Sequence, residues 1–408
     1  MRRPLYGWLA ADAISLTGTR LSMLALPWFV LTTTGDPTRT GLVALAEMTP
    51  LVVLKVLGGP ILDRIGPRRV SITCDLASTV VVALVPLLHA LHALSLGVLL
   101  LLVAVGGALR GPGDAAKYAL TPALVEHAGV PLERATGLAS MVERTAGMVG
   151  AALAGVLIGL VGAPTAIAVD AASFGVCAAV FAWATVGLPR IEPEASEATY
   201  LGQLRAGWDF LRSDRILVGI AVMVTLTNFI DQAYSSVLMP VWGRAYHGAA
   251  VVGALFAVFA GASAVGSAAA AHLATRLPRY VTYLVAFLLC GAPRFVVMAW
   301  PVSLVAVVAV FVVGGLASGF INPVLGAVEM ERIPRQLMGR VSSLMTACCW
   351  ALIPFGGLLG GGLVSGFGLT ATMLVCGAAY LVVTMLPAVD PTWREIDRRP
   401  QPSPSLTA

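Results

Sequence analysis

Charged residues are scarce in this chain. Only 12% of its 408 residues are Asp, Glu, Lys or Arg, against about 25% in an average soluble domain, and the mean hydropathy is +0.88. With so few charged residues, a soluble protein of this length could not cover its apolar surface. The composition therefore excludes a soluble globular protein and predicts an integral membrane protein.

Several chemical signatures are also missing. No glycine-rich loop followed by Lys and then Ser or Thr occurs, which excludes ATP as an energy source. The 5 histidines are scattered, and no two of them have the three to five intervening residues typical of a zinc site, so we expect no metal site. No serine or cysteine stands in a recognisable nucleophile setting, so we expect neither an enzyme nor a bound cofactor. The 6 cysteines all lie inside apolar runs, which argues against a disulfide framework.

Long apolar stretches, by contrast, run through the whole chain. A helix needs about 20 largely apolar residues to cross the hydrocarbon core. The sequence contains twelve such stretches, each bounded by charged residues, Gly or Pro. They lie near residues 6–34, 39–59, 71–91, 95–118, 136–161, 164–188, 215–241, 248–273, 280–299, 302–325, 339–364 and 368–388.

The loops between these stretches predict the orientation. Basic residues are retained on the cytoplasmic side of a membrane protein. With both termini inside, the inner segments hold 18 arginines and the outer loops only Arg39 and Arg244. These cytoplasmic arginines explain the net charge of +5, which therefore does not indicate a nucleic-acid partner. The partner that the apolar stretches imply is the lipid bilayer.

The second half of the chain repeats the first. Pro131 and Pro334 each precede a Ser by nine positions, at an offset of 203 residues, and Arg276 echoes Arg64 at an offset of 212. We therefore predict an N-terminal bundle over residues 1–188, a cytoplasmic linker over 189–214, a C-terminal bundle over 215–388 and a cytoplasmic tail over 389–408. For the linker, an amphipathic helix containing Trp208 and a merely solvated segment are equally open.

A short basic loop follows the second stretch and carries a family signature. It resembles the loop between helices 2 and 3 of the major facilitator superfamily, although Pro67 replaces the usual basic residue. The matching residues are Gly59, Asp63, Arg64, Gly66, Arg68 and Arg69. The resemblance implies that they lock a cytoplasmic gate.

Other segments are similar to the drug:proton antiporter branch of that superfamily, which includes macrolide efflux proteins and the enterobactin exporter. These are residues 15–31, 121–125 and 169–174. Residues 147–159 are similar to the antiporter signature of helix 5, with Ala151 where that signature has Pro. The resemblance implies an all-α integral membrane fold of twelve transmembrane helices in two pseudo-symmetric six-helix bundles. It also implies that helices 5 and 11 pack on helices 8 and 2.

Ionisable residues inside the apolar stretches are the candidate proton-coupling groups. Each costs at least about 2.5–3.5 kcal/mol at the bilayer centre, so each suggests a function. The candidates are Glu47, Asp231, Arg20, Asp12, Glu143 and Arg144. Equal distances from a turn suggest a Glu47–Arg20 pair and place Arg110 level with Glu143. The Glu47–Arg20 pair would either take part in proton coupling or only join two helices. Asp170 would either brace its own helix or take part in proton coupling.

The substrate cavity is expected between the bundles, on spans 1, 4, 7 and 10 of this fold. Its candidate lining residues are Met23, Arg110, Asn228, Tyr234 and Asn322. Met and Tyr at helical spacing are also ordinary packing residues. Both interpretations are open at this point.

Together these features predict a secondary transporter in a bacterial cytoplasmic membrane, monomeric and driven by the proton gradient. It exports small amphipathic molecules, such as an antibiotic, drug or secondary metabolite, by proton antiport with alternating access. Alternatives are an exporter of narrow specificity, for example for a siderophore, an uptake permease, or a sensor or scaffold that has lost transport. Idle buried charge disfavours the last.

Overall fold

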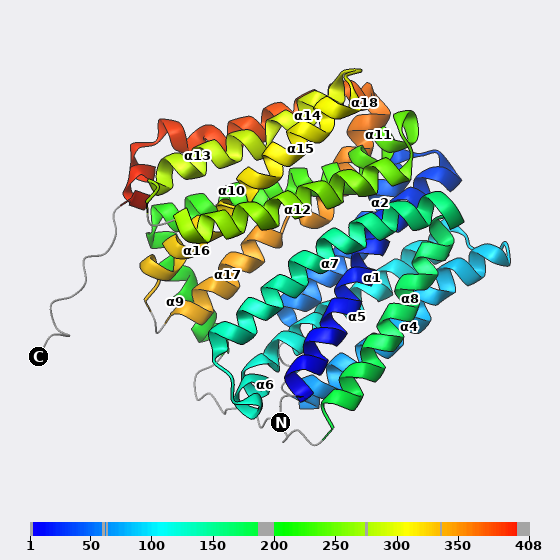
Figure 1. Ribbon diagram of the computed structural model, residues 1–408, viewed down its shortest axis with the longest axis horizontal. Helices are drawn as coiled ribbons and strands as arrows, with labels where there is room; N and C mark the ends of the chain where they lie inside the picture. Colours follow the sequence, from blue (N-terminus) through cyan, green and yellow to red (C-terminus); the bar gives the residue numbers. More distant parts are fainter. Residues whose placement is uncertain are drawn as a thin grey trace, which may run out of the picture. The chain divides into compact units, whose positions relative to one another are not determined.

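The computed structural model describes residues 3–58, 62, 64–186, 200–273, 276–334 and 337–397, and within these ranges all regular structure is helical (Figure 1). The first half contains α1 (Arg3–Thr34), α2 (Pro37–Leu57), α4 (Pro67–Ala90), α5 (Leu96–Ala119), α6 (Thr121–Ala128), α7 (Leu132–Val161) and α8 (Ala163–Ala184). The second half contains α9 (Tyr200–Ser213), α10 (Arg215–Ala233), the π-helix η1 (Tyr234–Leu238), α11 (Met239–Tyr246), α12 (Ala249–Leu273), α13 (Arg279–Cys290), α14 (Ala292–Ala299), α15 (Leu304–Ser318), α16 (Ile321–Arg332), α17 (Met338–Trp350), α18 (Ile353–Val389) and the 3₁₀ segment η2 (Pro391–Asp397).

Ten helical stretches in the described residues are long and apolar enough to cross a membrane. The last of them, Arg340–Val389, has 50 residues and would be about 75 Å long if straight. Its backbone leaves the helical region at Gly368 (φ 79°, ψ 168°), so it makes two crossings. Adding α2, which has 21 residues but carries Glu47 and Lys55, gives the predicted twelve spans. The predicted fold class is confirmed.

The helices gather into two compact units, and neither is a continuous piece of chain. The first contains residues 1–195, 228–261 and 351–372; the second contains 196–227, 262–350 and 373–408. The predicted division into bundles over 1–188 and 215–388 stays a prediction.

In the first unit, five helices form a closed ring. Contacts run from α1 to α8, from α8 to α4, from α4 to α5, from α5 to α2 and from α2 back to α1. Helix α7 packs on α1, and Figure 1 shows these helices running side by side. Side chains that point away from lipid therefore share one interior.

Glycines allow two very close helix contacts in the first unit. A Cβ on Gly155 of α7 would lie 2.9 Å from the Cα of Gly253 on α12, and one on Gly41 of α2 would run into the carbonyl of Gly357 on α18. Small residues let membrane helices approach this closely. The expected packing of helix 5 on 8 and of helix 11 on 2 is confirmed.

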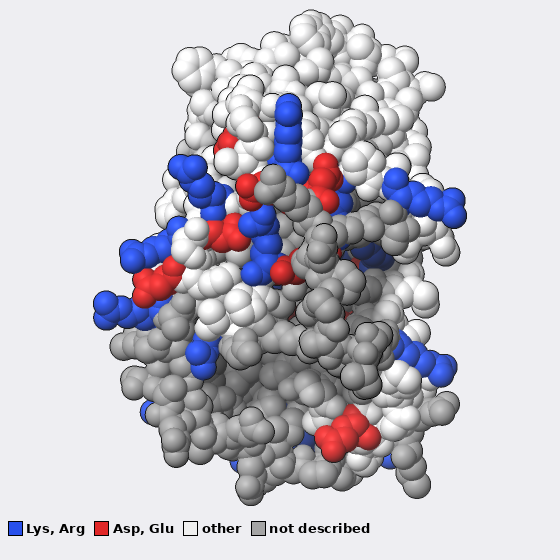
Figure 2. All heavy atoms as spheres, turned by 90° about the vertical axis from the view of Figure 1, so that its left-hand side faces the viewer, with Lys and Arg blue, Asp and Glu red and all other residues white. Residues whose placement is uncertain are grey.

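In the second unit, ion pairs join the ends of several helices to the C-terminal segment. Arg279 of α13 pairs with Glu331 of α16 at 2.6 Å. Arg332 pairs both with Asp214, which precedes α10, at 2.8 Å and with Glu395 of η2 at 3.3 Å. Figure 2 shows acidic and basic side chains interspersed on this side of the molecule. Of these pairs, Arg332–Glu395 is the one that holds η2 against the end of α16.

The linker is helical where it is described. Residues 189–199 of the predicted linker lie outside the described residues, but α9 packs on α17, with Gly207 against Arg340 and Leu344. Leu211 is buried and Trp208 is 49% exposed. A helix with one covered face therefore forms here, and that face packs on α17; a position at the inner membrane surface stays a prediction.

The contact between α7 and α12 has a direct test. In Gly253→Ala the new Cβ would lie 2.6 Å from the carbonyl oxygen of Ala151, so the backbones must separate. We expect a loss of about 1–3 kcal/mol, typical of overpacking, measured as a lower Tm of the purified protein in detergent. The control Gly362→Ala on α18, with open space around its Cβ, should not lower the Tm. Equal Tm values for both variants would contradict the close contact.

Candidate functional site

An ion pair crosses the ring of the first unit. The guanidinium of Arg110 on α5 donates to a carboxylate oxygen of Glu47 on α2 at 3.1 Å. Their side chains are only 14% and 17% exposed. The pair forms because α5 lies against α2 at Gly107 and Gly111, where a Cβ on Gly111 would lie 2.7 Å from the backbone oxygen of Leu51.

A second carboxylate lies on the opposite wall of the ring. Asp170 of α8 is 2% exposed. It accepts hydrogen bonds from the hydroxyl of Ser22 on α1 and, at 3.3 Å, from that of Ser173. Gly18 makes this possible, because a Cβ there would run into Ser173 and Asp170.

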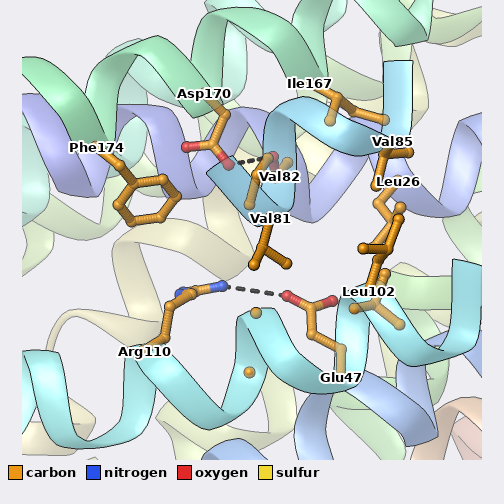
Figure 3. A pocket seen from close by; sticks show the side chains of 14 residues that line it. Leu26, Glu47, Val81, Val82, Val85, Leu102, Arg110, Ile167, Asp170 and Phe174 are labelled. Carbon is orange, nitrogen blue, oxygen red and sulfur yellow. Dashed lines mark hydrogen bonds and ion pairs between the residues drawn. The ribbon is translucent and has the colours of Figure 1, made fainter. Parts of the chain in front are cut away.

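These groups line one cavity, which encloses about 450 Å³ of empty space, part of it open to solvent. Figure 3 shows Arg110 and Glu47 pointing toward one another, with Asp170 entering from the other side. The remaining wall is mainly apolar, with Val81, Val82 and other aliphatic side chains. The cavity contains two carboxylates, Glu47 and Asp170, and one guanidinium, Arg110. When all three are ionised, one negative charge has no counterpart in this mainly apolar site.

Glu47 also borders a second pocket, whose empty space of about 350 Å³ includes open solvent. Its polar lining comes from Gln232, Ser235 and Ser236 at the junction of α10 and η1, and Met23 contributes to its apolar lining. An apolar pocket with a few polar groups is the usual form of a small-molecule site. Glu47 thus lies between this pocket and the cavity that contains Arg110 and Asp170.

The structure corrects the expected pairing of Glu47. Glu47 pairs with Arg110 rather than with Arg20. Arg20 faces α7, where it approaches Gly147 and Gly150, and its guanidinium lies 3.6 Å from the sulfur of Met23. Depth along a helix had suggested the Arg20 pair, but the direction in which each side chain points decides the partner.

The other predicted coupling residues are spread over the first unit. Asp12 of α1 is half-buried, and Lys117 is the cation that acts on it most strongly. On α7, Glu143 is exposed and Arg144 is half-buried. Asp231 of α10 is half-buried and adjoins Gln232 of the second pocket. None of these four lines the cavity with Glu47 as described.

The predicted substrate residues divide in the same way. Met23 lines the second pocket, whereas Arg110 lines the cavity inside the ring. Tyr234 is 2% exposed and so is a packing residue of η1. Asn228 is half-buried on α10, and Asn322 is exposed on α16.

Of the gate residues, Arg68 has a defined role in the first unit. It donates to the hydroxyl of Thr185 at 2.9 Å and to the carbonyl of Ala182 at 3.2 Å, so it satisfies the C-terminal end of α8. A cation is favourable at that end of a helix. Arg68 therefore joins the start of α4 to the end of α8.

The rest of the gate signature is only partly described. Gly59 and Asp63 lie outside the described residues. Gly66 precedes α4 with a φ of 88°, a conformation that favours glycine. Arg64 and Arg69 are exposed. Their locking role stays a prediction.

The sequence interpretation missed one buried network. Lys117 of α5 pairs with Asp75 of α4 at 3.1 Å, and both side chains are at most 6% exposed. Lys117 also donates to Ser15 at 3.3 Å, and the thiol of Cys177 donates to Asp75 at 3.3 Å. A signal was present, because Lys117 follows Arg110 by seven positions and thus shares its helix face.

The fold and the site together define a membrane transporter: helices of the first unit line two pockets that share Glu47, and one of them contains the Arg110–Glu47 pair. The comparisons with known proteins agree. Residues 9–230 and 221–406 match the sequence profile of the Major Facilitator Superfamily. The chain belongs to this superfamily, and it is a transporter rather than an enzyme.

Named relatives cover nearly the whole chain. It is 31% identical over 405 residues to the multidrug efflux pump Tap of Mycobacterium tuberculosis, which covers 98% of this chain and 96% of the relative. It is 21% identical to the staphyloferrin A transporter of Staphylococcus aureus, over 93% of this chain and 94% of that protein.

Solved structures share the fold. The nucleoside transporter NupG matches with a TM-score of 0.72 at 13% identity, covering 94% of this chain and 97% of that one. A bacterial homologue of the lysosomal transporter Spinster, inward-facing and unoccupied, matches with a TM-score of 0.71 at 14% identity, over 98% and 99% of the two chains.

A double-mutant cycle tests the Glu47 pair. Glu47→Gln or Arg110→Gln alone leaves a poorly solvated charge, whereas the double variant leaves none. Removing one partner of a buried pair costs about 3–5 kcal/mol; because these side chains are 14% and 17% exposed, we expect about 1–3 kcal/mol. Thermal unfolding in detergent should show that the double variant is more stable than either single variant. Additive losses would contradict a direct pair.

Proposed function

We propose that this transporter exports small amphipathic molecules in exchange for protons, with Glu47 as the coupling carboxylate. One observation carries the proposal: Glu47 borders both the pocket with Met23 and Gln232 and the cavity with Arg110 and Asp170. Substrate on one side and a proton on the other can therefore compete for the same group. The name of the multidrug efflux pump Tap, a relative at 31% identity, supports export of drug-like molecules.

The coupling step follows from the charges. An ionised Glu47 holds the Arg110 guanidinium at 3.1 Å. A proton on Glu47 removes that attraction, and Arg110 can then turn toward the Asp170 carboxylate across the cavity. This exchange would change the shape and the charge of the wall that faces the substrate pocket. Loss of the proton restores the pair and resets the site.

The pocket chemistry suggests the substrate class. Met23, Leu26, Pro27 and Val43 supply apolar contacts, and Glu47 is the acidic group that lines the pocket. Such a lining favours an amphipathic molecule that is neutral or cationic. A polyanionic substrate would be repelled by Glu47.

Alternating access would use the glycine contacts of the first unit. Gly155 against Gly253 and Gly41 against Gly357 bring backbones together without interlocking side chains, which suits contacts that must open and close. The π-helix η1 lies in the same unit and supplies Ser235 and Ser236 to the pocket. A π-helical turn inside a helix often occurs at a functional site.

The remaining features of the proposal follow from the sequence: a monomer in a bacterial cytoplasmic membrane, with both termini in the cytoplasm. A narrow exporter is the second candidate, because a relative at 21% identity is named a staphyloferrin A transporter. The acidic pocket lining favours the multidrug function over that alternative.

The proposal is tested by drug accumulation in an efflux-deficient bacterium. Cells expressing the protein should accumulate less ethidium and less of several labelled antibiotics, and a protonophore should abolish the difference. Glu47→Gln should lose most of the export because the carboxyl no longer releases a proton, and Asp231→Asn tests the second predicted carboxyl.

The matched control is Glu126→Gln, since Glu126 is exposed on α6; it should export like the original protein. Export that survives the protonophore would overturn proton antiport. Equal accumulation of every compound with and without the expressed protein would overturn the multidrug function and favour a narrow exporter or an uptake permease.

A further inference from the structure

Polar residues inside the five-helix ring recur every seven positions on three helices. Ser15 and Ser22 lie on α1, Arg110 and Lys117 on α5, and Asp170 and Cys177 on α8. Residues seven apart share one helix face, about 10.5 Å apart along the axis. The interior of the ring therefore contains two polar levels, one around Asp170 and one around Lys117.

Direct contacts hold the second level together across four helices. Lys117 contacts Asp75 and Ser15, and Cys177 contacts Asp75. The first level contains the bond from Ser22 to Asp170 and the Glu47–Arg110 pair. Each polar level therefore connects helices of the same five-helix ring.

Small and hydroxyl-bearing residues separate the two levels. Ser173 lies between Asp170 and Cys177 and bonds to Asp170, and Ser78 lies one turn beyond Asp75 and is 1% exposed. Gly18 and Gly113 occupy the corresponding positions on α1 and α5. Buried hydroxyl groups are the partners that a chain of water molecules requires, whereas the glycines bring the helices together, since a Cβ on Gly18 would run into Ser173 and Asp170.

A third level points to water directly. Trp8, Ser71 and Thr121 are 5%, 0% and 9% exposed, yet the indole Nε1 and the two hydroxyls have no hydrogen-bond partner among the described residues. Ser71 lies one turn from Asp75, and Thr121 lies one turn from Lys117. Buried polar atoms are nearly always hydrogen-bonded, to protein or to ordered water.

From these three levels we infer that a hydrated proton path runs through the interior of the N-terminal helices, from Asp170 by way of Asp75 to the level of Trp8, Ser71 and Thr121. Its ligands are water molecules and one proton. A proton held by Asp170 passes through the Ser173 and Ser78 hydroxyls and water to the Asp75 carboxylate. It then leaves from Asp75 to water at the third level, and each carboxylate regains its negative charge.

The charges around Asp75 favour a passing cation. Lys117 and Asp114 act on it from α5, Cys177 acts from α8, and Asp12 of α1 belongs to the same group of charges. Cys74 adjoins it on α4, and the nearest acidic group of α7, Glu143, acts on Asp12. Asp114 is exposed and also acts on Lys55 of α2, so the inner group consists of Asp75 and Asp12 against Lys117. Its excess negative charge attracts a proton and repels anions.

The purpose of the path rests on the proposed proton antiport, but its hydration can be tested without any substrate. Cys177 is the reporter, because its thiol contacts Asp75 in the middle of the path. Infrared spectroscopy of the purified full-length protein, transferred to D₂O, follows the conversion of S–H to S–D. Cys177→Ala assigns its band. Cys376→Ala assigns the band of a comparison thiol, 3% exposed in the second unit.

We expect Cys177, although 0% exposed, to exchange at least about tenfold faster than Cys376, because water reaches it through the path. Ser71→Ala with Thr121→Val removes two unpaired hydroxyls at little change in volume and should slow Cys177 to the rate of Cys376. Thr384→Val, also at a buried threonine, is the matched control and should leave Cys177 unchanged.

A dry interior gives a different result. Cys177 then exchanges as slowly as Cys376, and Ser71→Ala with Thr121→Val only raises the Tm by removing unsatisfied polar atoms. Either finding overturns the path, and neither depends on transport.

A second measurement links the path to coupling. The double variant Asp75→Asn, Lys117→Gln removes the pair without leaving a single charge. In proteoliposomes it should bind ethidium as the original protein does, while proton movement coupled to ethidium, read with a trapped pH dye, falls about tenfold. Fast Cys177 exchange without any ethidium-coupled proton movement in the original protein would overturn the antiport and leave the path standing. Unchanged coupling in the double variant would exclude Asp75 from the proton route.

Discussion

The absence of water from the bilayer core is the constraint on which the rest of this structure depends. In hydrocarbon a charged or polar group must find its partner within the protein. The first unit meets this demand by enclosing its ionisable groups in a ring of helices, where Arg110 pairs with Glu47 and Lys117 pairs with Asp75. Both are deep cation–carboxylate pairs. Each one is also the centre of a polar level.

The same constraint explains the role of the glycines. An arginine or a lysine side chain reaches only a few ångströms, so the helices that carry its partner must come close. Gly107 and Gly111 bring α5 against α2 beside the Glu47 pair, and Gly18 brings α1 against Asp170. Glycine in a helix costs about 1 kcal/mol relative to alanine. In this protein that cost is offset by the charge pairs and the packing that close approach permits.

Much of the fold could be predicted from the sequence, because hydrophobic length and loop charge depend on composition alone. The twelve spans are of this kind, whereas the contacts of α7 with α12 and of α18 with α2 were expected from the resemblance to the superfamily. The partner of Glu47 is not, since equal depth in the membrane says nothing about direction around the helix axis. Arg20 lies at the right depth but faces α7, whereas Glu47 faces α5. Tyr234 shows the same limit: the sequence left cavity lining and packing both open, and its burial in η1 decides for packing.

The Lys117 network shows that the spacing of polar residues along several helices indicates a shared interior that single charges do not. Searching for single charges within apolar stretches selected Glu47 and Arg110 and passed over Asp75 and Lys117, which lie nearer to the stretch ends. A seven-residue period in polar side chains on α1, α5 and α8 marks one shared interior before any contact is known. A seven-residue period on one helix alone would indicate little, because polar residues such as serine recur at that spacing by chance. Three helices whose polar residues are in register, and whose side chains then prove to be in contact, distinguish a built interior from scattered polar residues.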